Sequence, residues 1–293
     1  MHKNQEQLNE QKGSLYTIIS GLCYGLVGYF GMSIMHSNLS MSNMLFWRFL
    51  ISSSLVGLLI MTSGKAINED RKSMLKVFFY GAAFYSAATI TYFSASMYIG
   101  TGLAMVIFFT YPAIIMLFNW VWHRKPIPKT YYIAIALILI GLIFLTDLSS
   151  LKYDMIGAGL GILSAVSYAG YIVSNKKIKI SPLISTLMVS LGCMVTFFIL
   201  ANLQFSFVIP TTLSMWSNIF GMGLICTALP ILLLLEGLKY ISEEKASLLS
   251  VLEPVFVVVF GIMLLGEKIS VPQIVGIFTI LCGALITLLS KKI

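Results

Sequence analysis

The sequence contains very little charge. Lysine, arginine, aspartate and glutamate make up 10% of its 293 residues, whereas soluble domains carry about 25%. Apolar residues make up 58% of the chain, and its mean hydropathy is +0.92. A water-soluble fold has no means of burying so much apolar surface. These values therefore exclude a soluble protein and indicate that lipid surrounds most of the chain.

Histidine and cysteine are scarce as well, with three and four residues respectively. The cysteines lie in apolar stretches without C-x-x-C spacing, so we expect neither disulfides nor a metal site. The sequence also lacks an H-E-x-x-H zinc motif, a G-x-S-x-G hydrolase motif and a phosphate-binding glycine loop. These absences argue against the corresponding enzymes, and we expect no cofactor. The first dozen residues are polar, which predicts that no signal peptide is cleaved.

Apolar segments fill the rest of the chain. A helix needs about 20 apolar residues to cross a bilayer. Charged residues separate most of these segments, and two long uncharged runs break near Gly100 and Pro210. We therefore predict an all-α membrane protein with ten transmembrane helices. The predicted helices span residues 14–36, 42–62, 74–97, 102–123, 130–147, 155–175, 182–203, 214–238, 245–265 and 271–290.

Basic residues gather at alternate ends of these helices. Sixteen of the nineteen fall in segments on one side of the membrane, Lys152 and Lys268 fall on the other, and Arg48 alone lies within a helix. The positive-inside rule places the rich side, and with it both termini, in the cytoplasm. Basic residues spread over six segments do not form a nucleic-acid surface. Short loops and the Lys-Lys-Ile ending point to a bacterial inner membrane.

The two halves of the sequence resemble each other. At a constant offset of 142 residues, three pairs match, and at an offset of 144 Tyr24 faces Tyr168. Each half holds five predicted helices, an odd number, so the halves enter the membrane from opposite faces. We predict an inverted repeat of residues 14–147 and 155–290, an architecture typical of alternating-access carriers. The three pairs are Tyr98 and Tyr240, Pro112 and Pro254, and Gly141 and Gly283.

Taken together, these segments resemble the EamA-type branch of the drug/metabolite transporter superfamily. The resemblance rests on the paired halves, on FWRFLIS in helix 2, on the segments around Tyr24 and Tyr168, on the two prolines, and on LLGEKIS with Glu267. One departure is WHRKPI, which stands in the first half where the second has LLGEKI. The resemblance implies two five-helix EamA-like repeats and secondary transport of amino acids or other small metabolites.

Charged residues in or beside apolar spans are candidates for function. A charge at the bilayer centre costs at least about 2.5–3.5 kcal/mol. Glu253 lies near the middle of helix 9, and Pro254 leaves a backbone carbonyl near position 250 without its helical donor. A carboxyl there suits binding of a solute or a proton. The alternative is a structural ion pair or a neutral, hydrogen-bonded acid.

Arg48 and Glu236 have competing interpretations. Arg48 has the geometry to clamp a substrate carboxylate, or it forms a structural pair on the outer side of the membrane. Glu236 precedes Lys239 by three residues near the inner end of helix 8, which predicts a surface ion pair. The outer acids considered as partners of Arg48 are Asp147, Asp154 and Glu267.

Aromatic residues inside the predicted helices suggest a polar cavity. A buried tyrosine in lipid needs a partner for its hydroxyl group, and several tyrosines together suit an aromatic, cationic or zwitterionic solute. Ordinary packing is the alternative for each of them. Three prolines are expected to kink their helices, namely Pro112, Pro230 and Pro254. The tyrosines expected to bind substrate are Tyr24, Tyr85, Tyr92, Tyr111 and Tyr168.

These features favour a secondary transporter that binds a small molecule between its halves and alternates access. The expected partners are that molecule, the lipid bilayer, and a proton or a counter-solute; the sequence leaves the oligomeric state open. A membrane enzyme and a channel are the alternatives. Accumulation against a gradient separates a carrier from a channel, and product formation identifies an enzyme.

Overall fold

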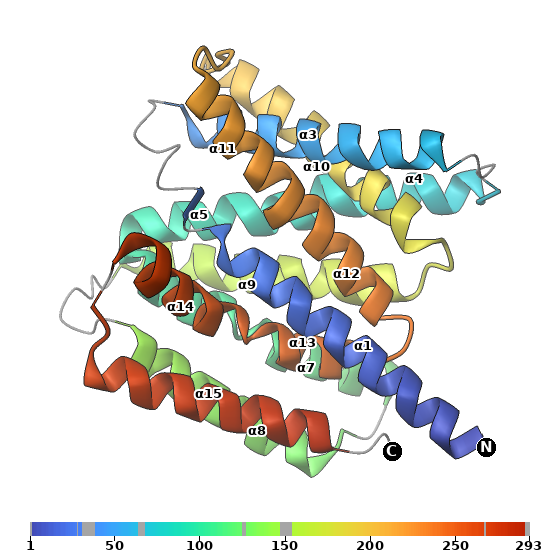
Figure 1. The fold of residues 1–293 in the computed structure, drawn as a ribbon, viewed down its shortest axis with the longest axis vertical. Coiled ribbons are helices and arrows are strands. Elements are labelled where there is room, and N and C mark those ends of the chain that lie inside the picture. Colours follow the sequence, from blue (N-terminus) through green and yellow to red (C-terminus); the bar gives the residue numbers. More distant parts are fainter. Residues whose placement is uncertain are drawn as a thin grey trace.

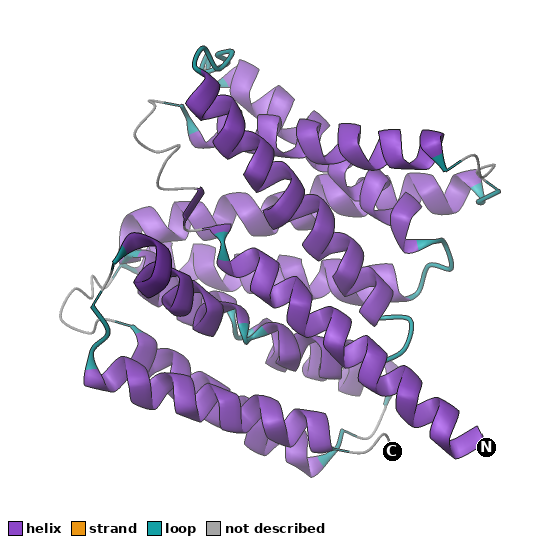
Figure 2. Cartoon of the chain, viewed as in Figure 1, coloured by secondary structure: helices purple, strands orange, loops and turns teal. Residues whose placement is uncertain are grey.

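The computed structural model describes residues 2–27, 29–30, 39–63, 68–124, 127–146, 154–266 and 268–290. All regular structure in these residues is helical (Figure 2). The prediction of an all-α protein is therefore confirmed for the part of the chain that the structure describes.

Helices of the first half occupy most of the predicted ranges of helices 1 to 5, although α1 ends at Gly25 and residues 31–36 and 147 of those ranges lie outside the described residues. The segments α4, η1 and α5 follow one another directly, and η1 is a π-helical turn. Their bounds are α1 (His2–Gly25), α3 (Met41–Thr62), α4 (Arg71–Tyr80), η1 (Gly81–Tyr85), α5 (Ser86–Ile99), α6 (Thr101–Phe108), α7 (Tyr111–His123) and α8 (Lys129–Leu145).

Helices of the second half follow the same plan, with a second π-helical turn, η3, between α11 and α12. The sequence did not predict either π-helical turn. The bounds are α9 (Met155–Lys176), α10 (Pro182–Leu203), α11 (Leu213–Gly223), η3 (Leu224–Ala228), α12 (Leu229–Gly237), α13 (Glu243–Ser250), α14 (Glu253–Leu265) and α15 (Val271–Leu289).

Seven helices among the described residues are long and apolar enough to cross a membrane. The apolar helix α8 is shorter, at 17 residues. These spans make the chain a multi-pass membrane protein, while the full count of ten crossings remains a prediction. The seven candidates are Met41–Thr62, Thr101–Trp122, Met155–Lys176, Pro182–Leu203, Leu213–Gly237, Glu243–Leu265 and Val271–Leu289.

Helix α1 begins earlier than the predicted start at residue 14. It starts at His2, because the polar residues before Gly13 include Glu, Gln and Lys, which are good helix formers. Most residues from 5 to 12 are exposed. In Figure 1 the first helical turns of α1 extend beyond the bundle toward the end marked N.

Two helices are interrupted at equivalent places in the two halves. The break at 109–110 separates α6 from α7, and the break at 251–252 separates α13 from α14. Both breaks, and the starts of the flanking helices, are related by the offset of 142 residues. Pro112 and Pro254 lie in the first turn that follows each break, where a proline costs the helix no hydrogen bond. The structure therefore interrupts both helices beside prolines that were expected to kink them.

Helices from the two halves pack in pairs across the bundle. Helix α8 lies along α15, α3 along α10, α5 along α9, and α1 across α12 (Figure 1). Glycines permit the closest approaches. A Cβ atom on Gly141 of α8 would lie 2.7 Å from the Gly276 carbonyl oxygen of α15, so no side chain fits there.

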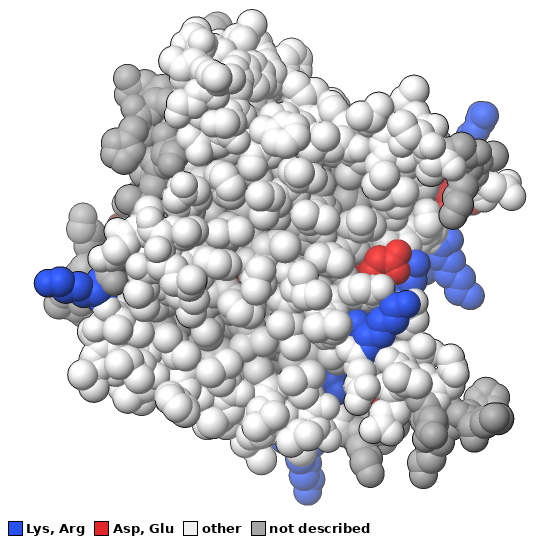
Figure 3. Space-filling view, viewed as in Figure 1, with Lys and Arg blue, Asp and Glu red and all other residues white. Residues whose placement is uncertain are grey.

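Contacts between helix ends define a basic end of the bundle. Lys245 at the start of α13 bonds Glu10 of α1 and the end of α15, and Thr130 of α8 bonds Ser290. Figure 3 shows most of the visible Lys and Arg atoms toward the side of the view where Figure 1 marks N and C. At the opposite end, Thr146 after α8 lies against Gly102 of α6.

The contact between α10 and α4 gives a first prediction. A Cβ atom on Gly192 would lie 2.2 Å from the Phe78 carbonyl oxygen and 2.8 Å from the Ala82 nitrogen. Replacing Gly192→Ala must therefore separate the two helices, and we expect a loss of about 1–3 kcal/mol in unfolding free energy. Thermal unfolding of the detergent-solubilised protein measures this loss.

Gly159→Ala is the matched control, because a Cβ atom there meets nothing within 4 Å. The higher helix propensity of alanine should leave its stability unchanged or raise it by up to about 1 kcal/mol. Equal stability of the two variants would contradict the packing described here.

Candidate functional site

A cavity of about 510 Å³ lies in the middle of the bundle. It reaches from the helix breaks toward Ser96 and Thr101, at the end opposite to the basic end. The structure brings together around it all seven side chains that the sequence predicts for a binding site. Those side chains are Tyr24, Arg48, Tyr85, Tyr92, Tyr111, Tyr168 and Glu253. Their role in binding remains a prediction.

The helix breaks place two of these side chains. Tyr111 is the first residue of α7, and Glu253 is the first residue of α14. The two residues are equivalent in the repeat, because they are 142 positions apart. The same local geometry therefore presents a phenol from the first half and a carboxyl from the second half to one cavity.

Aromatic rings make up much of the cavity wall. The Tyr111 and Tyr168 rings meet edge to face, with centroids 4.8 Å apart, and Phe108 packs against both rings at 5.3–5.4 Å. The hydroxyl groups of Tyr24 and Tyr85 lie 2.9 Å apart and share a hydrogen bond. Offset and edge-to-face pairs of this kind hold the rings in fixed positions, so the wall is preformed.

The Glu253 carboxyl is the acid of this cavity. It is partly exposed, and no hydrogen bond or ion pair joins it to any other residue that the structure describes. Arg48 lines the same cavity and acts on it electrostatically. A carboxyl inside a protein needs a proton, a cation or a hydrogen-bond donor, and this one lines the cavity.

Arg48 is held by the protein itself. Its Nε atom donates to Thr227 Oγ1 over 2.5 Å, and its Nη2 atom donates to the Cys226 carbonyl oxygen over 2.7 Å. That carbonyl lacks its helical donor, because Pro230 has no N–H group at the fourth position beyond it. These bonds favour the structural interpretation of Arg48 over a free clamp for a substrate carboxylate.

The acids considered as partners of Arg48 do not take that role where they are described. Asp154 accepts a hydrogen bond from the Gly157 nitrogen over 2.8 Å and caps α9. Asp147 and Glu267 lie outside the described residues. The partner that Arg48 does have is the Cys226 carbonyl oxygen, which Pro230 leaves without an α-helical donor. No local pattern in the sequence predicts this contact between different helices.

Two other expectations concern Glu236 and Pro230. Lys239 Nζ lies 2.9 Å from Glu236 Oε2, so the predicted surface pair is confirmed, and neither residue lines the cavity. Pro230 follows η3, but η1 is present at the matching place in the first half, before Ala88. The distortion is therefore common to both halves, although the proline is not.

The sequence missed several residues of the cavity wall. The polar residues Thr89, Ser96 and Thr101 line it, and so do Met105 and Phe108. The position of Phe108 beside a predicted proline break was a usable signal. The threonines and the serine carry none, because these residue types are common on the apolar faces of membrane helices.

Comparisons with known proteins agree on the kind of protein. The profile of the EamA-like transporter family matches residues 11–147 and 155–289. An uncharacterized transporter of Archaeoglobus fulgidus is 28% identical over 211 residues, which cover 70% of this chain and 74% of that protein. The uncharacterized transporter YxxF of Bacillus subtilis is 22% identical over 283 residues, which cover 94% of this chain and 89% of YxxF.

A named exporter and a solved structure are similar as well. The pseudopaline exporter CntI of Pseudomonas aeruginosa is 23% identical over 213 residues, which cover 70% of this chain and 74% of CntI. One crystal structure matches with a TM-score of 0.81 at 16% identity, over 94% of this chain and 96% of its own. At that identity the structural match shows the shared fold alone.

The bonds of Arg48 give a second prediction. Replacing Arg48→Gln removes the bond from the guanidinium to the Cys226 carbonyl oxygen, and both residues are buried. We expect a loss of about 1–3 kcal/mol in unfolding free energy, measured by thermal unfolding in detergent. Arg71→Gln, at an exposed helix start, is the control and should change stability little. If the two variants are equally stable, Arg48 does not hold the helices together.

Proposed function

The chain belongs to the EamA-like transporter family, and we propose that it is a secondary transporter of small organic solutes that carry an amino group. Amino acids and related zwitterions or cations are the proposed substrates. The family is one of transporters, and the structure contains several apolar helices long enough to span a membrane. The relative named as a pseudopaline exporter supports a small organic molecule as the substrate.

The Glu253 carboxyl is the observation that carries this proposal. It lines the cavity and has no hydrogen bond or ion pair to other described residues, whereas the nearby Arg48 is bonded to Thr227 and Cys226. A solute with an ammonium group would supply the charge-assisted hydrogen bonds that the carboxyl lacks.

The tyrosine wall supports the same class of solute. Rings attract a cation over their faces when it lies within about 6 Å of the ring centroid. Tyr111 and Tyr168 line the same cavity as Glu253, so one ammonium group would lie among a carboxylate and aromatic faces. The apolar residues Met105 and Phe108 would contact the rest of the solute.

The basic end of the bundle is the proposed cytoplasmic end, in accordance with the positive-inside rule. Both termini would then lie in the cytoplasm, and a bacterial inner membrane is the proposed location. The cavity reaches from the breaks toward Thr101 at the opposite end. In this conformation the site therefore faces outward.

Transport would follow from the repeat. The helix breaks at 109–110 and 251–252 are equivalent, so the two halves can exchange conformations and open the site to the other face. A proton on Glu253, or exchange against a second solute, would supply the driving force. Protonation removes the charge of the carboxyl and with it the strongest contact to a cationic solute.

Glu253→Gln tests the proposal in proteoliposomes. Amino acids and amines that raise the thermal stability of the purified protein are first identified, and uptake of the best of them is then measured. We expect the variant to lose about tenfold or more of the uptake rate, because one charge-assisted contact is removed. Uptake by the variant should also no longer depend on a pH difference across the membrane.

Glu236→Gln is the control, because it removes an exposed carboxylate of a surface pair. Its uptake and pH response should match those of the unaltered protein. Unchanged uptake and unchanged pH response in Glu253→Gln would remove this carboxyl from the mechanism.

A further inference from the structure

A buried charged cluster closes the basic end of the bundle. Its members are Glu10, Asn119, Glu243, Glu244 and Lys245, and we call it the gate cluster. Asn119 has no exposed surface, and Lys245, Glu243 and Glu244 are 3%, 6% and 7% exposed. Lysine and glutamate are almost never buried to this extent unless they are paired, so the contacts within the cluster need an explanation.

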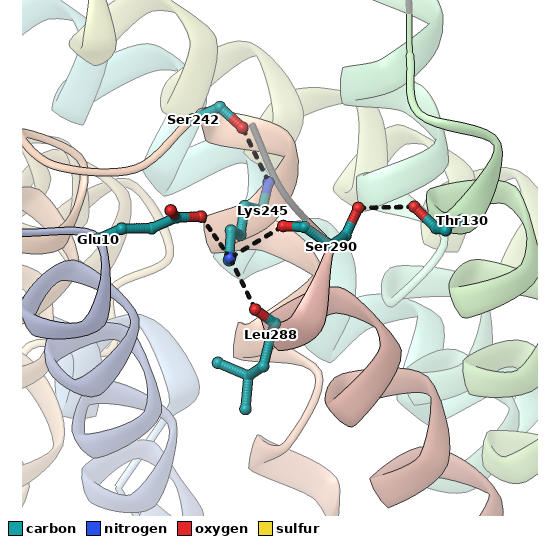
Figure 4. Close-up of polar contacts among 6 residues, drawn as sticks. All are labelled: Glu10, Thr130, Ser242, Lys245, Leu288 and Ser290. Carbon is teal, nitrogen blue, oxygen red and sulfur yellow. Dashed lines mark hydrogen bonds and ion pairs between the residues drawn. The ribbon is translucent and has the colours of Figure 1, made fainter. Parts of the chain in front are cut away.

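The ammonium group of Lys245 donates hydrogen bonds to three acceptors (Figure 4). Its Nζ atom donates to Glu10 Oε1 over 2.7 Å, to the Leu288 carbonyl oxygen over 3.1 Å and to the Ser290 carbonyl oxygen over 3.5 Å. The two carbonyl groups belong to the end of α15, where a helix carries partial negative charge and lacks donors. The ammonium group thus joins the starts of α1 and α13 to the end of α15.

The cluster also joins the two halves of the chain. Glu10 on α1 and Asn119 on α7 belong to the first half, whereas the other members belong to α13 of the second half. Asn119 Nδ2 donates to Glu243 Oε1 over 3.1 Å and also to Glu244 Oε1. Access to the cavity from the basic end requires these contacts between the halves to separate.

The equivalent place in the first half is uncharged. At the offset of 142 residues, Glu243, Glu244 and Lys245 correspond to Thr101, Gly102 and Leu103. Thr101 and Gly102 line the cavity at its opposite end. The three equivalent positions are therefore uncharged where the cavity is open, and they carry charged side chains at the closed end.

We propose that the Lys245–Glu10 ion pair is the latch of an inner gate, and that Lys245 is a positioning residue that holds α13 against α1 while the cavity faces outward. This inference rests on the proposed alternating-access function. The latch opens when the first half rotates away and Glu10 becomes hydrated, since Lys245 keeps its bonds to α15 within its own half. The ion pair, rather than apolar packing, sets how readily the gate opens.

Two single cysteines test the latch by their reaction with a membrane-impermeant maleimide. Ser96 lines the outward part of the cavity, and Ser250 is 8% exposed and lies between the gate cluster and the break at 251–252. The parent protein carries Cys282→Ser, because Cys282 is exposed while the other three cysteines are buried. Right-side-out vesicles report on Ser96→Cys, and inverted vesicles report on Ser250→Cys.

In the parent protein we expect Ser96→Cys to react from outside and Ser250→Cys to react slowly from inside. Adding Glu10→Gln or Lys245→Gln should raise the inside reaction rate of Ser250→Cys about tenfold, as a shift toward the inward-open state. Lys245→Arg keeps the charge and should restore the slow reaction. Lys239→Gln removes an exposed pair of the same chemistry and should leave the rate unchanged.

The latch is refuted if Glu10→Gln and Lys245→Gln react no faster than Lys239→Gln, or if Lys245→Arg reacts as fast as Lys245→Gln. Glu10 has a side chain that is 29% exposed, so Glu10→Gln decides the test even where Lys245→Gln fails to fold. Failure of Ser96→Cys to react from outside is a separate outcome. It would refute the outward-facing cavity, and hence the proposed function, whatever the latch does.

Discussion

Inside a bilayer a backbone group has no water to bond, and this constraint governs where the helices of this protein are allowed to break. Broken helices survive in lipid only where the freed groups are buried in protein or face a cavity. Both breaks meet that condition. Thr110 Oγ1 bonds the Ile107 carbonyl oxygen, and the Tyr111 hydroxyl bonds the Ser247 carbonyl oxygen of the other half. The cavity, its acid and its aromatic wall all follow from placing two breaks against each other.

The two halves share a backbone plan and differ in chemistry. The repeat gives both halves a π-helical turn, a break and a proline after the break. Pro230 adds a freed carbonyl group in the second half, and Arg48 of the first half bonds it. At equivalent positions, Tyr111 of the first half and Glu253 of the second half line the same cavity. The cavity therefore has an aromatic side and an acidic side, in a scaffold of nearly equivalent halves.

Sequence alone predicted the helices and the wall of the site, but not its supports. The apolar runs located α10 at residues 182–203, because a membrane helix is defined by length and hydropathy. Glu253 and the tyrosines were identified because polar groups in lipid are costly. The sequence analysis assigned no role to Glu10, which lies in the polar first dozen residues. Its partner Lys245 lies 235 positions away. Pairing at that distance depends on the tertiary fold, which no local pattern records.

The order of synthesis bears on the buried lysine. The ribosome makes Glu10 first, Lys245 much later, and the carbonyl groups at the end of α15 last. The anion that neutralises Lys245 is thus already present when the ninth predicted helix enters the membrane. The surroundings of this buried ammonium group are completed only when the last helix is in place, so a protein truncated before α15 would retain an incompletely bonded ammonium group.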